Sequence, residues 1–158
     1  EGLALFVLLA LAIRAGAPDW PCAKGCDTCC RHLADVPSLT AMEWERLRDA
    51  LAALPERQRE RISRAVAALP EAPAGPVVCP LLDGETGACP VYACRPVACR
   101  TYGFYVQRDR GLYCRTIEVQ AAGALADTVW GNHDAVDRRL AALGETRPLT
   151  AWFRAAPA

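Results

Sequence analysis

Four cysteines lie close together near the start of the chain, in the segment Cys22-Ala-Lys-Gly-Cys26-Asp-Thr-Cys29-Cys30. If this segment were helical, the offsets i, i+4, i+7 and i+8 would place all four sulfurs within about a 100° arc of one face. An adjacent pair such as Cys29 and Cys30 rarely forms a disulfide without strain. Clustered thiolates instead suit soft metals, namely zinc, copper(I) or iron–sulfur centres. The segment therefore predicts a metal centre.

A second group of cysteines follows at Cys79, Cys89, Cys94 and Cys99, and Cys114 stands apart from both groups. One structural zinc or one iron–sulfur cluster of the usual forms takes four cysteines. Eight clustered thiols therefore predict two centres, or one centre with spare thiols nearby. The total of nine is odd, whereas a secreted disulfide framework normally has an even number in a shorter chain.

The composition is that of a globular chain, with 53% hydrophobic and 23% charged residues. A length of 158 residues predicts a single domain, 1–158, with a core that does not depend wholly on metal or disulfides. The 18 basic residues balance the 18 acidic ones. Nothing in the charge therefore argues for nucleic acid as a partner, and no protein partner can be named.

The first residues contain the apolar run Leu3–Ile13, which is shorter than the ~20 apolar residues that a membrane-spanning helix needs. We expect a buried first helix over residues 3–14 and a cytoplasmic protein. The alternative is an export signal, because the small residues 15–17 resemble a cleavage site. Pro18 would then occupy the first position of the mature chain, which counts against this alternative.

Two helices are predicted between the cysteine groups. The first begins at the capping-box sequence Thr40-Ala-Met-Glu43. Apolar residues recur at roughly helical spacing after it, at Met42, Trp44, Leu47, Leu51 and Leu54. Pro55 suits the first position of a second helix that continues to Leu69. We expect the pair to form an αα-hairpin.

The remaining elements complete a mainly α prediction: a small helical domain with a short β-hairpin, organised around a cysteine-held metal centre. Residues 77–82 and 88–92 flank the glycine-bearing loop 83–87, which indicates the β-hairpin. The C-terminal helices are expected over 118–158, with a break around Gly131-Asn132. Leu149–Phe153 forms a last apolar patch that we expect to dock on the helices.

The order and spacing of the cysteines resemble those of the YkgJ-type cysteine-cluster family, also described as the CxxCxxCC zinc- or iron-chelating domain. The motifs that carry the resemblance are Cys22-x3-Cys26-x2-Cys29-Cys30, Cys79-Pro-Leu-Leu82, Gly87-Ala-Cys89-Pro-Val-Tyr92 and Arg95-Pro96-x2-Cys99-Arg100. They span about residues 22–103. The resemblance implies a largely helical metal-binding domain to which no reaction is attached.

The resemblance also implies which residues hold the metal. The metal ligands that it indicates are Cys22, Cys26, Cys29, Cys30, Cys79, Cys89 and Cys99. Cys94 and Cys114 are secondary candidates. The implied metal is zinc or iron, with a 4Fe–4S cluster as an open alternative. Arg95 and Arg100 are candidates for lowering the pKa of nearby thiols and offsetting the charge of a thiolate cluster.

Two other functions remain open at this point. One is a protein-modifying enzyme, because the flagellin lysine N-methylase group carries a similar cysteine cluster. Against it, the chain shows no glycine-rich nucleotide loop after a strand and no acid–base pair, so no catalytic residue is predicted. The other is an exported, disulfide-stapled domain. His32 is expected to be a partly exposed residue, with an outer ligand role as the alternative.

Overall fold

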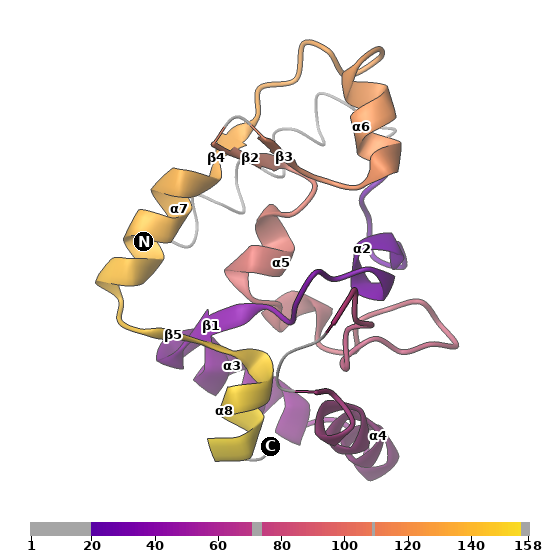
Figure 1. Cartoon of the computed structure of the whole chain (residues 1–158). Coiled ribbons are helices and arrows are strands. Elements are labelled where there is room, and N and C mark those ends of the chain that lie inside the picture. The colour runs from indigo at the N-terminus through magenta and orange to yellow at the C-terminus, as the bar shows by residue number, and fades with distance from the viewer. Residues whose placement is uncertain (1–19, 71–73, 109, 156–158) are drawn as a thin grey trace. The chain divides into compact units, whose positions relative to one another are not determined.

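The structure is a computed structural model that describes residues 20–70, 74–108 and 110–155 (Figure 1). The contacts within the chain divide it into two compact units. We call residues 24–96 and 143–158 the thiol unit, and residues 1–23 and 97–142 the hairpin unit. The predicted helix over residues 3–14 lies outside the described residues. The single domain over 1–158 stays a prediction.

Helices dominate the described residues, as predicted, and the strands are short. The thiol unit contains α2 (Thr28–Arg31), β1 (Ser38–Thr40), α3 (Ala41–Ala52), α4 (Glu56–Ala67), the 3-10 helix η1 (Tyr92–Cys94), β5 (Thr146–Pro148) and α8 (Leu149–Ala155). Strand β1 pairs antiparallel with β5, with Leu39 opposite Arg147. This pairing holds β5 beside the strand that leads into α3 (Figure 1).

Helix α3 begins at the predicted capping box. The Glu43 amide donates to the Thr40 hydroxyl at 3.3 Å, and the Glu43 carboxylate accepts from the Thr40 amide at 2.9 Å. The helix buries Trp44, Leu47 and Leu51. Met42 is 59% exposed, so its predicted place on the apolar face is wrong. It lies only two residues before Trp44, and residues two apart on a helix point in different directions.

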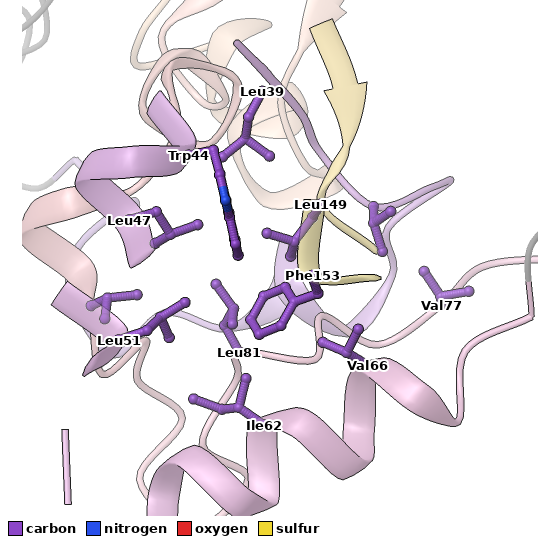
Figure 2. Close-up of a cluster of buried hydrophobic side chains, with 12 residues drawn as sticks. Leu39, Trp44, Leu47, Leu51, Ile62, Val66, Val77, Leu81, Leu149 and Phe153 are labelled. Carbon is purple, nitrogen blue, oxygen red and sulfur yellow. The ribbon is translucent and has the colours of Figure 1, made fainter. Parts of the chain in front are cut away.

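The core of the thiol unit joins α3, α4 and α8 (Figure 2). Helix α4 contributes Ile62 and Val66, one turn apart, so its buried stripe follows the helical period. Phe153 of α8 meets the ring of Trp44 edge-on, with 5.0 Å between the ring centroids. The predicted docking of residues 149–153 is therefore confirmed. Both predicted helices form and share this core.

The β-hairpin predicted over residues 77–92 is wrong, because neither arm forms a strand. Pro80 and Pro90 lack the amide hydrogen that each strand would need to donate to a ladder. The segment instead contains turns, the closed loop 83–88 and η1. A hairpin does form, but it is in the hairpin unit.

The hairpin unit contains α5 (Val97–Thr101), β2 (Tyr105–Gln107), β3 (Arg110–Leu112), α6 (Arg115–Ala121), β4 (Gly131–Asn132) and α7 (His133–Ala142). Strand β2 lies between β3, its antiparallel partner, and β4, its parallel partner. Trp20 stacks on Phe104 in the core, with 5.4 Å between the ring centroids. The predicted break at Gly131-Asn132 is confirmed. However, α6 ends at Ala121, so the predicted helix across 122–130 is wrong.

The first cysteine segment is helical only over Thr28–Arg31. Gly25 has a φ of 95°, which lies in the left-handed region. A right-handed helix therefore cannot continue from Cys22 through Gly25 into α2. The four sulfurs therefore do not share one helical face. Among the described residues, no helix is long and apolar enough to cross a membrane.

Candidate metal centre

Backbone hydrogen bonds bring the two cysteine groups of the thiol unit together. Leu33 and Val77 form an isolated antiparallel bridge, with N–O distances of 3.0 Å from Leu33 and 2.8 Å from Val77. The Cys79 amide then donates to the Cys30 carbonyl at 2.7 Å. These bonds satisfy backbone groups that would otherwise lack partners near the core. They also fix the start of the second cysteine group beside the end of α2.

The loop after Cys79 turns back on itself and returns the chain to Cys89. The Asp83 amide donates to the Ala88 carbonyl at 3.0 Å, and the Gly87 amide donates to the Asp83 carbonyl at 2.9 Å. Gly87 has a φ of 64°, which a glycine adopts without steric penalty. Cys79 and Cys89 both pack, half-buried, against the core of the thiol unit. Both ends of the loop thus place a thiol against the same core.

Four thiols of the thiol unit interact with one another. The sulfurs of Cys29 and Cys30 are 4.0 Å apart. The Cys30 thiol also hydrogen-bonds with the Cys79 thiol, and the charge of Cys89 is close enough to act on Cys30. Cys29, Cys30, Cys79 and Cys89 are all free thiols and not disulfides. The structure therefore brings together two predicted ligands from each cysteine group.

The surroundings of these thiols favour the protonated form. The hydrogen bond with Cys30, together with burial, raises the pKa of the Cys29 thiol far above its ordinary value. The bond with Cys29 lowers the pKa of Cys30, but the bond with Cys79 and burial outweigh it and raise that pKa to about 12. Burial raises the pKa of Cys89. A metal ion would therefore have to displace protons in order to bind these sulfurs.

Arg95 is placed to favour the thiolate of Cys89. Its guanidinium lies 3.5 Å from the centroid of the Tyr92 ring, and its Nε donates to the Tyr92 carbonyl at 3.1 Å. The positive charge opposes the effect of burial on the pKa of Cys89. The predicted electrostatic role of Arg95 therefore has a specific thiol on which to act.

The four thiols are donors of the type that soft metals prefer, and one pair of them, Cys29 and Cys30, also has a suitable separation. Tetrahedral zinc with Zn–S bonds of ~2.3 Å requires sulfurs about 3.8 Å apart. The Cys29–Cys30 separation of 4.0 Å is close to this value. Among the described residues, no group of three Cys, His, Asp or Glu side chains already has the spacing of a metal site. Binding of a metal ion by these four thiols would therefore require their sulfurs to move closer together as they lose their protons.

The other predicted ligands are placed differently. Cys26 lies in an exposed turn, and its thiol is 3.9 Å from the Thr28 hydroxyl. Cys94 is half-buried at the end of η1. The remaining candidates, Cys22, Cys99 and Cys114, belong to the hairpin unit. For all five of these cysteines, the role as a metal ligand stays a prediction.

The two histidines lie at a surface position and at the start of a helix. His32 is exposed, and its Nδ1 lies 3.1 Å from the Thr28 carbonyl in the preceding turn. His133 begins α7, next to the predicted break. Sequence reasoning missed the bridge between Leu33 and Val77, although it is this bridge that aligns the cysteine groups. The only available signal was that each residue lies within three positions of a cysteine.

Comparison with known proteins identifies a family for this chain. The sequence profile of the CxxCxxCC family, described as a "putative zinc- or iron-chelating domain", matches residues 21–124, which are 104 of the 158 residues. No curated protein and no solved structure shows a significant match. The matched stretch contains all nine cysteines. The chain therefore belongs to the CxxCxxCC family.

Proposed function

We propose that this protein holds one soft metal ion, zinc or iron, through the thiolates of Cys29, Cys30, Cys79 and Cys89. The observation that carries the proposal is the interaction of the Cys29–Cys30 pair with the thiols of a separate segment. Four soft donors match the number that a tetrahedral site uses. Neutral core cysteines would account for burial. They would not account for a backbone arrangement that gathers four thiols from two segments.

A single ion is favoured over a 4Fe–4S cluster by the contact between Cys29 and Cys30. Around one ion every pair of sulfurs is in near contact, whereas each cysteine of a cluster binds a different iron, which separates the sulfurs further. The 4.0 Å separation matches the first arrangement. When bound, zinc would supply a structural cross-link, and iron would add a redox couple.

The protein's own residues would prepare the centre for the ion. The bond between the Cys79 amide and the Cys30 carbonyl fixes the two segments before any ion binds. Arg95 stabilises negative charge on Cys89, so that thiol loses its proton more readily than burial alone would allow. Packing of Cys79 and Cys89 against the core excludes water from one side of the site.

The test is the metal content of the full chain after anaerobic purification. We expect about one zinc or iron per chain, without acid-labile sulfide. Cys30→Ser and Cys79→Ser should lose the metal, while Cys94→Ser, a matched change of a half-buried thiol in the same unit, should retain it. Iron with an equal amount of labile sulfide would favour the cluster instead. A metal-free protein that cannot be loaded with Zn²⁺ or Fe²⁺ would contradict the proposal.

A further inference from the structure

We propose that Arg61 is a positioning residue for the metal centre: its guanidinium fixes the loop between Cys79 and Cys89 and places positive charge beside it. This inference rests on the proposed function, because it assigns a supporting role to a residue that is not a ligand. Arg61 belongs to α4 and lies outside every cysteine motif.

The contact that carries the inference is a hydrogen bond at the middle of the loop. Nη1 of Arg61 donates to the Leu82 carbonyl at 2.7 Å in a partly buried position. The Leu82 amide in turn donates to the Cys79 carbonyl at 3.0 Å. The next residue, Asp83, closes the loop through its bond with Ala88, immediately before Cys89. Arg61 therefore holds the peptide that links the turn after Cys79 to the loop before Cys89.

The guanidinium also acts on the loop through its charge. The backbone amides of Thr86 and Glu85 lower the pKa of the Asp83 carboxyl, and the positive charge of Arg61 adds to this effect. Nη2 of Arg61 is buried and has no hydrogen-bond partner among the described residues. A buried donor of this kind in a native protein calls for an explanation. Compensation of a negatively charged thiolate centre provides one, because four thiolates exceed the charge of a divalent ion by two.

Arg59 of the same helix also has a buried nitrogen, Nε, without a hydrogen-bond partner among the described residues, whereas Arg57 and Arg64 lie at the surface. Arg57 is exposed. Arg64 pairs with Glu60, at 3.7 Å, and its side chain is 73% exposed. Exposed pairs of this type contribute little to stability. Arg64 therefore offers a matched control: the same residue type on the same helix, pointing to solvent.

The experiment compares Arg61→Met, Arg61→Lys and Arg64→Met with the unmodified full chain. Zn²⁺ affinity is measured by competition with a chelator, Co²⁺ is used as a spectroscopic probe of the site, and urea unfolding reports the stability of the metal-free protein. We expect Arg61→Met to lose roughly 10–100-fold in Zn²⁺ affinity, the range typical of residues that orient metal ligands. Its Co²⁺ ligand-field bands should shift or broaden. Arg61→Lys should recover part of the affinity, because it keeps the charge without the planar fork.

The outcomes separate this inference from the proposed function. An unmodified chain that binds no metal overturns the proposed function, and this inference with it. If the unmodified chain binds metal and Arg61→Met matches Arg64→Met within threefold, with unchanged Co²⁺ bands, Arg61 is not a positioning residue. If Arg61→Met does not fold, the Zn²⁺ affinity and urea midpoint of Arg61→Lys test the inference instead. Weaker Zn²⁺ binding at an unchanged urea midpoint supports the inference, and unchanged binding overturns it.

Discussion

The two units of this protein contain cysteines in different settings. In the thiol unit, Cys29, Cys30, Cys79 and Cys89 interact with one another beside a largely aliphatic core. In the hairpin unit, Cys22 and Cys114 pack against an aromatic core in which Trp20 stacks on Phe104. The same residue type thus serves as part of a thiol network in one unit and as a neighbour of aromatic rings in the other.

This difference indicates in which unit metal binding should increase the stability of the fold. A ligand that binds only the folded state stabilises it by mass action, by ~2.7 kcal/mol at a free concentration 100 times its Kd. In the thiol unit the proposed ion would connect α2 with the loop after Cys79. The hairpin unit has its own core and its own three-stranded sheet. Metal should therefore protect the thiol unit more than the hairpin unit.

The largest effect is expected when the thiol network itself is broken. Cys30→Ser removes the thiol that interacts with both Cys29 and Cys79, so Zn²⁺ affinity should fall by more than the roughly 10–100-fold that loss of an orienting residue causes. The matched change in the hairpin unit, Cys114→Ser, should alter affinity by less than threefold. Both values come from competition with a chelator. Equal losses in the two variants would remove the distinction between the units.

Core truncations should sharpen the comparison, with smaller effects. Leu51→Ala in the thiol unit and Ile117→Ala in the hairpin unit each delete a side chain that is at most 2% exposed, so each should destabilise the protein by about 2–5 kcal/mol. Hydrogen exchange of amides in each unit measures the local effect. Added Zn²⁺ should restore protection around Leu51 more than around Ile117. Equal restoration would show that the ion does not act through the thiol unit alone.

Local signals in the sequence predicted those parts of the fold that depend on neighbours along the chain. Thr40 and Glu43 specified the start of α3, and Gly131-Asn132 marked the break before α7. The hairpin expected over 77–92 failed, although its glycine-bearing loop is present. Pro80 and Pro90 removed the donors that strands would need. The resemblance of the cysteine motifs to a known family correctly identified the family, which the profile match confirms.

Long-range contacts could not be read from those signals. Strand β5 pairs with β1 although more than 100 residues separate them, and its residues show no strong strand pattern. Likewise, Leu33 gives no indication that it bridges to Val77 and so aligns the cysteine groups. Cysteine spacing identified the thiols but not which of them meet. Arg61 was missed because a charged helix residue usually faces solvent, and only the packed fold shows its contact with Leu82.

Substitution of one glycine in each unit should change the stability of the protein by less than the core truncations do. Gly103 of the hairpin unit has a φ of 91°, and a Cβ there would lie 3.1 Å from the Cys22 sulfur and 3.3 Å from Cδ1 of Ile117. Gly25 of the thiol unit has a φ of 95° with no atom within 4 Å of such a Cβ. Gly25→Ala should therefore cost only the backbone strain, about 1–2 kcal/mol. Gly103→Ala should cost more, because crowding adds to the same strain. Urea unfolding measures both, and a larger effect at Gly25 would contradict the assigned packing.

The smallest effect concerns the pH dependence of the metal-free protein. Folding raises the pKa of Cys29 and Cys30 above the ordinary value of 9.0, so the folded state holds these protons more tightly than the unfolded state. This contribution to stability is complete below pH 9. It decreases as pH rises from 9 toward the pKa of Cys30, about 12, because the unfolded chain gains stability by releasing protons there.

The thiol network should therefore make the metal-free chain more sensitive to alkali. We expect the urea midpoint, measured under reducing conditions with a chelator present, to fall between pH 8.5 and pH 10.5. Tyrosines also titrate in this range, and burial raises the pKa of Tyr105 in the hairpin unit. The Cys29→Ala/Cys30→Ala double variant isolates the thiols, because it retains the tyrosines and loses the pair. Its midpoint should fall less than that of the unmodified chain. An identical fall in both proteins would mean that the pair ionises as easily in the folded chain as in the unfolded one, which the contact between the two sulfurs opposes.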